Sequence, residues 1–315
     1  GGYTLETLVD TEHSKPGKKV KVGNAKIEDS HDVAAEKSDS RVTLLDAFAH
    51  SSNIYFAEAI YTNFKDNPNQ YWEYLNELHF NETVGLDEYG EKSGYIPEPM
   101  GKVWREIHGS LGRSLPYLGY GYIVELPPIH TLTFFNGVAN GGRMVAPRLV
   151  DHIERDGKVI KRIPSKVIME KMCSERTIDI LHECLSAAAA PARTKRRFAN
   201  LPFNIGCKTG TSEINGKFIS DATEDKRKMN LGIINYNYNL GSVVCMMPLE
   251  KPKYTVMVAM LKESMYDKDT HFGIDVAGPA ASDIMLYLYN NDPELHPAVS
   301  KAPSPYTPTN IKGGD

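Results

Sequence analysis

The chain is 315 residues long, with 41% apolar and 24% charged residues and a formal net charge of -4 at pH 7. This length suits one large domain or two modest ones with a sizeable core, and the acidic balance gives no general basis for binding nucleic acid. No signal peptide and no run of about 18 apolar residues is present, so the chain as given is expected to be soluble.

The first 42 residues carry few signals of regular structure. Only Lys18–Gly23 alternates enough to form one arm of a short hairpin. The sequence opens without a methionine, in a stretch that reads like the middle of a domain. We therefore expect it to be a fragment of a longer chain.

Two helices are predicted next, separated by Ser51-Ser52-Asn53. Thr43 can cap the first helix, whose apolar residues share one face, and the second helix runs from Ile54 to about Phe64. A serine or asparagine at such a break can simply cap the second helix. A chemical role for these three residues therefore needs a partner elsewhere in the chain.

Helices, a loop and a hairpin are predicted in the middle of the chain. Residues 69–80 form an amphipathic helix with aromatic side chains on one side, and the glycine- and proline-rich residues 85–104 form a loop. Pro127-Pro128 opens a helix that Asn140-Gly141-Gly142 ends. Asp156-Gly157 supplies the tight turn of a hairpin over residues 150–163, and residues 175–190 form another helix.

Three strands and a helix are predicted toward the C-terminus. The first strand carries Lys208 and is followed by a polar stretch from Ile214 to Asn239, and the other strands cover residues 241–247 and 254–261. The last strand is largely apolar on both faces, so helices should cover it on both sides. A terminal helix over residues 275–290 follows. These elements indicate an α+β fold, in which an antiparallel sheet is flanked by helices and accompanied by a separate helical subdomain.

The four cysteines do not form a recognisable metal or redox motif. Cys173, Cys184, Cys207 and Cys245 lack the CxxC spacing of zinc and redox sites and lie mostly among apolar residues, which favours buried free thiols. The ten histidines are scattered and include no HExxH pair. Neither a metal nor a cofactor is predicted.

Lys208-Thr209-Gly210-Thr211 is the first candidate for chemistry, because a lysine and two hydroxyls on a strand edge can hold an anion. A phosphate-binding loop needs a glycine directly before the lysine, where this chain has Cys207, and another five positions earlier, where it has Pro202. The alternative is the Lys-Thr-Gly element that serine acyl-transferases place beside the reacting carbonyl. A purely structural interpretation is an edge-strand lysine that discourages sheet pairing.

Four motifs occur in the order and spacing of one family. They are Ser51-Ser52-Asn53, the loop Gly94-Tyr95-Ile96-Pro97-Glu98-Pro99 followed by Trp104, the region Gly119–Pro147 with Ala139-Asn140-Gly141-Gly142, and Lys208-Thr209-Gly210-Thr211. On these motifs, nearly the whole chain resembles the transpeptidase domain of a class B penicillin-binding protein of the cell-division or elongation type. The resemblance implies the penicillin-binding and serine β-lactamase-like transpeptidase fold. The predicted elements leave a cleft between the sheet and the helices, where the first and last motifs can meet.

One motif of that family is missing from this chain. The family's nucleophile lies in a Ser-x-x-Lys motif before Ser-x-Asn, and no Ser-x-x-Lys occurs in this sequence. We therefore expect residues 1–292 to be a partial transpeptidase domain that lacks its N-terminal part with the nucleophile, and residues 293–315 to be a disordered tail. This chain is then expected to be inactive. A natural pseudoenzyme is the alternative.

The resemblance implies roles for Ser51 and Asn53. In the intact enzyme the missing serine attacks the carbonyl between two terminal D-alanines of a peptidoglycan stem peptide, with the missing lysine as base, and an acceptor amine resolves the acyl-enzyme. Ser51 relays protons to the departing amine, its hydroxyl lying between the missing lysine and Lys208. Asn53 positions the substrate amide and the missing lysine.

The resemblance also implies roles for the Lys-Thr-Gly-Thr residues. Lys208 attracts the terminal carboxylate of the substrate, and the hydroxyls of Thr209 and Thr211 donate hydrogen bonds to it. The Thr211 N–H forms half of the oxyanion hole, and one such donor contributes on the order of 3 kcal/mol to transition-state stabilisation. Gly210 allows close approach of the substrate or of the strand behind it.

Partners and location follow from the same resemblance. The intact protein is expected to bind peptidoglycan stem peptides, β-lactams and membrane proteins of cell division or elongation, but no nucleic acid. Its place is the bacterial inner membrane, with this domain facing the periplasm. The alternatives are a non-catalytic scaffolding or binding module of the cell-wall machinery and a D,D-carboxypeptidase. A serine β-lactamase is disfavoured by the long insertions and the chain length.

Overall fold

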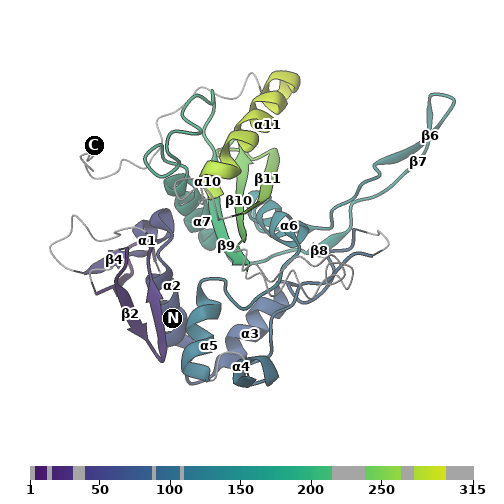
Figure 1. Cartoon of the computed structure of the whole chain (residues 1–315). Coiled ribbons are helices and arrows are strands. Elements are labelled where there is room, and N and C mark those ends of the chain that lie inside the picture. Colours follow the sequence, from purple (N-terminus) through teal and green to yellow (C-terminus); the bar gives the residue numbers. More distant parts are fainter. Residues whose placement is uncertain are drawn as a thin grey trace, which may run out of the picture. The chain divides into compact units, whose positions relative to one another are not determined.

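The computed structural model of the chain describes residues 4–12, 16–30, 40–86, 90–106, 110–214, 238–263 and 273–295. Within these ranges the chain divides into two compact units, one formed by the residues up to Ala187 and the other by the residues from Ala188 onward. We call them the first unit and the second unit; their elements are labelled in Figure 1. Across the same ranges, we find no helix with the length and apolar character that spanning a bilayer requires.

The first unit contains mostly helices and short antiparallel strand pairs. In chain order its described elements are β1 (Leu8–Asp10), β2 (Lys19–Val22), β3 (Ala25–Glu28), β4 (Arg41–Thr43), α1 (Leu44–His50), α2 (Asn53–Phe64), α3 (Pro68–Glu77), α4 (Lys102–Glu106), α5 (Leu111–Gly119), α6 (Pro128–Ala139), β5 (Met144–Val145), β6 (His152–Arg155), β7 (Lys158–Arg162), β8 (Val167–Met169) and α7 (Glu175–Ala188). The strands pair as β1 with β4, β2 with β3, β5 with β8 and β6 with β7.

The two helices predicted around Ser51-Ser52-Asn53 are confirmed. Thr43 caps α1, because its hydroxyl accepts the N–H of Asp46 at 3.1 Å. α2 begins at Asn53 rather than at Ile54, since Ser52 is its N-cap. α2 lies against β2, β3 and α5, and this packing fixes the turn between α1 and α2 at one edge of an apolar cluster.

α5 is a helix that the sequence analysis does not predict. Pro116 lies inside it, and proline is the poorest helix former. Leu115 and Leu118 of α5 are nevertheless buried in one cluster with Trp104. Because most helical stability in a folded protein comes from tertiary packing, this burial outweighs the poor propensity.

The predicted hairpin over residues 150–163 is confirmed as β6 and β7. Both turn residues have the positive φ that a tight hairpin turn needs, 51° at Asp156 and 73° at Gly157. Every residue of the two strands is exposed, and Figure 1 shows them as a thin projecting ribbon. The predicted α6 is also confirmed, from Pro128 to Ala139.

The second unit is a sheet covered by helices. Its described elements are β9 (Gly206–Ile214), β10 (Tyr238–Met247), β11 (Tyr254–Glu263), α10 (Gly273–Val276), α11 (Gly278–Asn291) and the 3-10 helix η1 (Pro293–Leu295). The strands are antiparallel in the order β11-β10-β9, and α10 and α11 lie against them (Figure 1). The polar stretch predicted between β9 and β10 lies largely outside the described residues.

The central strand β10, rather than β11, is buried on both faces. Every residue from Val243 to Met247 is buried, whereas Met260 and Leu261 of β11 are 45% and 55% exposed. The prediction that helices cover residues 254–261 on both sides is therefore wrong. An apolar composition suits any buried strand, and it does not reveal which strand occupies the centre of the sheet.

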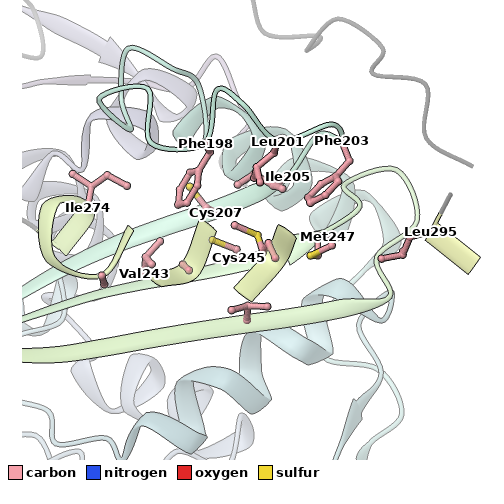
Figure 2. Packing of buried hydrophobic residues seen from close by; sticks show 14 residues of the cluster. Phe198, Leu201, Phe203, Ile205, Cys207, Val243, Cys245, Met247, Ile274 and Leu295 are labelled. Carbon is pink, nitrogen blue, oxygen red and sulfur yellow. The ribbon is translucent and has the colours of Figure 1, made fainter. Parts of the chain in front are cut away.

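One apolar cluster holds the second unit together. It joins inward-facing side chains of β9 and β10 to α10, α11 and the segment before β9 (Figure 2). Leu295 of η1 belongs to this cluster and is 3% exposed. Regular structure thus continues through Leu295, past the boundary expected at residue 292, while residues 296–315 lie outside the described ranges.

Candidate active site

Ser51 lies at the end of α1 in the left-handed backbone conformation, with φ 57° and ψ 48°. Its N–H donates to the carbonyl oxygen of Phe48 at 3.2 Å, which closes the last turn of the helix. Residues other than glycine adopt this conformation uncommonly. Here it reverses the chain so that Ser51 is exposed and the next residue, Ser52, is buried.

Ser52 and Asp29 form a buried hydrogen-bonded pair. The Ser52 hydroxyl donates to the Asp29 carboxylate at 2.7 Å and accepts the N–H of Tyr55 at 3.1 Å. Asp29 is 1% exposed and also accepts the N–H of Ile54 at 3.0 Å. A carboxylate at the start of α2 additionally suits the helix dipole. The pair therefore supplies hydrogen-bond acceptors for the N–H groups of Ile54 and Tyr55 in the first turn of α2.

Asn53 also serves the fold. Its side-chain amide donates to the carbonyl oxygen of Glu28, the last residue of β3, at 2.9 Å. The capping interpretation of this turn is therefore correct for Ser52, while Ser51 is the residue of the three that stays exposed. Asp29 was not predicted from the sequence. Its only signal is a carboxylate directly after the alternating pattern of β3.

Lys208 occupies a partly buried position on β9, next to the fully buried Cys207. Its Nζ donates to the carbonyl oxygen of Thr209 at 3.2 Å. Burial lowers the pKa of Lys208 from 10.5 to about 8, and the neighbouring Cys207 acts in the opposite direction. The amine is thus still mostly protonated at pH 7, in a place where water screens its charge poorly.

Thr211 is held by the first residue of α10. The N–H of Gly273 donates to the Thr211 hydroxyl oxygen at 3.0 Å. Because this bond uses the oxygen as an acceptor, the hydroxyl hydrogen of Thr211 remains available as a donor to another group. A hydroxyl donor on the same strand as a lysine is suited to bind a carboxylate.

Two glycines allow the close contact between α10 and β9. A Cβ atom on Gly273 would lie 2.2 Å from the carbonyl oxygen of Gly210 and 2.5 Å from that of Ser242. A Cβ atom on Gly210 would lie 2.8 Å from the hydroxyl oxygen of Ser242, its partner on β10. A side chain at position 210 would therefore crowd the neighbouring strand β10. Gly273 was not predicted from the sequence.

An ion pair fixes α10 in place. The carboxylate of Asp275 is 4% exposed and binds Lys195 at 2.7 Å and Arg197 at 3.7 Å. Since Asp275 lies two residues after Gly273, this pair supports the hydrogen bond to Thr211. The basic residues before β9 thus have a structural partner.

β9 brings together four of the six predicted site residues, Lys208, Thr209, Gly210 and Thr211. Their positive charge and hydroxyl donors can bind an anion at one strand. Ser51 and Asn53 belong to the first unit, whereas β9 belongs to the second. In the described ranges, no group of three or more histidine, cysteine, aspartate or glutamate side chains is arranged to hold a metal ion.

The sequence matches the penicillin binding protein transpeptidase domain family over residues 3–286. The chain belongs to this family. The matched range includes both Ser51-Ser52-Asn53 and Lys208-Thr209-Gly210-Thr211. The predicted family membership is thus confirmed at the level of the transpeptidase domain.

Solved structures of penicillin-binding proteins confirm the predicted α+β transpeptidase fold. The transpeptidase domain of Burkholderia pseudomallei penicillin-binding protein 3 is 18% identical, with a TM-score of 0.64 over 91% of this chain and 73% of that chain. Penicillin-binding protein 2B of Streptococcus pneumoniae is 17% identical, with a TM-score of 0.64 over 95% and 45%. Penicillin-binding protein 3 of Mycobacterium tuberculosis, in complex with ampicillin, is 16% identical, with a TM-score of 0.67 over 99% and 62%.

The transpeptidase chain is shorter than several of these relatives. It spans less than two thirds of the streptococcal and mycobacterial chains. A search of curated proteins gave no match.

Proposed function

We propose that this chain is part of a class B peptidoglycan D,D-transpeptidase of the cell-division or elongation machinery. In the intact enzyme, a serine attacks the carbonyl between the two terminal D-alanines of a stem peptide and expels the last one. An acceptor amine then converts the resulting ester into a cross-link. The observation that carries the proposal is Lys208-Thr209-Gly210-Thr211 on β9, in a chain that matches the transpeptidase family over residues 3–286.

In this proposal, β9 binds the substrate's terminal carboxylate. Lys208 supplies the charge, and the hydroxyls of Thr209 and Thr211 supply hydrogen-bond donors. The bond from Gly273 to the Thr211 oxygen supports this role, because it leaves the Thr211 hydroxyl hydrogen to point elsewhere. The Thr211 N–H contributes to the oxyanion hole, and Gly210 keeps the strand free of a side chain at this point.

In this proposal, Ser51 and Asn53 act on the departing amine and on the substrate amide. Ser51 relays the proton to the departing amine, and its exposure supports such a role. Asn53 positions the substrate amide together with the lysine of the nucleophile motif. The hydrogen bond from its side chain to Glu28 holds it in place for that task.

The nucleophile is assigned to residues outside this sequence, because no Ser-x-x-Lys occurs in it. The 315-residue chain is therefore expected to be inactive. We expect the intact protein to be anchored in the bacterial inner membrane, with this domain in the periplasm and membrane proteins of division or elongation as partners. Since the mycobacterial relative forms a complex with ampicillin, we expect the intact protein to be acylated by β-lactams.

Covalent labelling with a fluorescent penicillin tests this proposal. The coding sequence is extended upstream until it includes a Ser-x-x-Lys motif, and folding is checked by circular dichroism. We expect label on the extended protein, none on its variant with the motif serine replaced by alanine, and none on the present chain. A folded extended protein that takes no label, or a gene without that motif, supports the scaffolding alternative instead.

Products distinguish a transpeptidase from a D,D-carboxypeptidase. A stem pentapeptide is incubated with the extended protein in the presence of an acceptor stem peptide, and products are separated by mass spectrometry. We expect a cross-linked dimer with release of one D-alanine. If D-alanine is released and the tetrapeptide forms without any dimer, the protein is a D,D-carboxypeptidase that transfers the acyl group to water.

A further inference from the structure

Cys207 and Cys245 lie directly opposite each other on β9 and β10. Both are buried, at 0% and 1% exposure, in the apolar cluster of the second unit (Figure 2). We propose that these two thiols form a disulfide that joins β9 to β10 directly beside Lys208 when the chain folds in an oxidising medium. The proposal does not depend on the function proposed above.

The strand register supports this bond. Directly opposite residues of an antiparallel pair have Cα atoms about 4.5 to 5.5 Å apart, and a disulfide needs Cα atoms about 4.4 to 6.8 Å apart. Opposite side chains also leave the sheet on the same face. Cys207 and Cys245 both enter the same cluster, so their sulfur atoms share one side of the sheet. The strands therefore need little movement to accommodate the bond.

The two thiols already interact in their reduced form. The pKa of Cys245 is raised well above its ordinary value of 9.0, mainly by its hydrogen bond with Cys207 and, to a smaller extent, by burial. Because the thiolate is the reactive form, the folded thiol reacts slowly. We therefore expect oxidation during folding, before α10 and α11 cover β10, rather than after it.

The other two cysteines provide an internal control. Cys173 and Cys184 lie in the first unit, and within the described strands no register pairs either of them with another cysteine. Burial raises the pKa of the Cys184 thiol to about 12 and also raises that of Cys173. Because neither lies opposite a cysteine in a described strand pair, both are expected to remain thiols under conditions that oxidise the pair on the sheet.

Oxidised glutathione, a small-molecule disulfide, is a suitable oxidant. One cysteine thiolate attacks the glutathione disulfide and releases one reduced glutathione. The second cysteine thiolate then displaces the other glutathione from the mixed disulfide. The two protein thiols lose two electrons and two protons, which end on two molecules of reduced glutathione. In a bacterial periplasm, the proposed location, thiol oxidants are maintained by the cell.

Refolding under controlled redox conditions tests the proposal. The chain is unfolded, reduced and refolded with a mixture of oxidised and reduced glutathione, and free thiols are then alkylated in denaturant. We expect two alkylated cysteines, Cys173 and Cys184, and one tryptic species that links the peptides of Cys207 and Cys245. Four alkylated cysteines, or any other pairing, would overturn the proposal.

Two variants separate the bond from a general effect of oxidation. Cys173→Ala/Cys184→Ala should still form the linked species, whereas Cys245→Ala should not. The oxidised wild type should melt about 5 °C or more above the reduced wild type, because a cross-link restricts the unfolded chain. A disulfide from Cys207 to Cys173 or Cys184 in Cys245→Ala, or an unchanged melting temperature in the wild type, would count against the assignment. The same oxidant added to the folded protein should act at least about tenfold more slowly.

Discussion

The turn between α1 and α2 and the strand β9 both carry residues of the proposed site, but the fold uses the polar side chains of the two places differently. At the turn, the Ser52 hydroxyl donates to the Asp29 carboxylate, and both side chains accept N–H groups from the first turn of α2. On β9, burial disfavours the charge of Lys208 and lowers its pKa to about 8. Polar residues at the turn thus stabilise the fold, whereas the charge on β9 costs stability. A side chain whose pKa is strongly shifted by burial is the better indicator of chemistry.

The largest expected effect comes from Lys208→Met. In the extended protein, acylation by a penicillin should fall about 100-fold or more, because the charge that attracts the carboxylate is lost. The free energy of unfolding should rise by about 1 to 3 kcal/mol, because a partly buried charge is replaced by an apolar side chain of similar length. Labelling rates and urea unfolding measure the two effects. A variant that loses both activity and stability would show that Lys208 is a structural residue.

Asp29→Ala should have the opposite effect on stability from Lys208→Met. The change leaves the Ser52 hydroxyl and the Ile54 N–H without their acceptor, so the free energy of unfolding should fall by about 3 kcal/mol. The exposed Asp66, in the same unit, is the matched control, and Asp66→Ala should change stability by less than about 0.5 kcal/mol. Urea unfolding followed by circular dichroism measures both. Equal effects of the two variants would contradict the role of Asp29.

The adjacent serines sharpen the comparison within a single turn. Ser52→Ala removes the cap of α2 and a donor to Asp29, so it should cost about 1 to 2 kcal/mol of stability. Ser51→Ala should leave stability within about 0.5 kcal/mol, because Ser51 is exposed. In the extended protein, Ser51→Ala should instead slow acylation. If Ser51→Ala destabilises the chain as much as Ser52→Ala, then Ser51 also has a structural role, and the predicted difference between the two serines is wrong.

The smallest expected effect is on pH dependence. The folded pKa of Lys208, about 8, lies below its ordinary value of 10.5, so its charge is present below pH 8 and lost above it. Acylation should therefore fall about fivefold from pH 8 to pH 9. Stability should change in the opposite direction and increase between about pH 8 and pH 10.5, since the unfolded chain binds the proton more tightly there.

Lys208→Arg provides the control for this titration, because arginine keeps its charge over the whole range. The part of the decline that comes from position 208 should be absent in this variant. An identical decline in both proteins would assign it to another group. The stability gain above pH 8 should likewise disappear in the arginine variant.

Elements with strong local signals could be predicted from the sequence. Thr43 and Ser52 are good caps, and Asp156-Gly157 suits a tight turn, so α1, α2 and the β6–β7 hairpin were predicted correctly. α5 was not, because its stability comes from the burial of Leu115 and Leu118 rather than from its own residues. The central position of β10 was missed for the same reason, because the place of a strand in a sheet depends on the strands that pair with it and not on its own residues.

The candidate site was proposed from residues that are chemically unusual for their position. A lysine between apolar and hydroxyl residues on a strand is such a case, and it led to Lys208 and Thr211. Asp29 and Gly273 were missed because their roles depend on partners distant in the chain, Ser52 for one and Thr211 for the other. No periodicity or short motif records a hydrogen bond between separate segments.

The exposed hairpin of β6 and β7 has a practical consequence for studies in living cells. None of its strand residues is buried, and its turn at Asp156-Gly157 is exposed as well. Loop tips of this kind tolerate insertions well. A short epitope or a dye-binding peptide placed between Asp156 and Gly157 would therefore report where the protein is without disturbing β9 or the turn between α1 and α2.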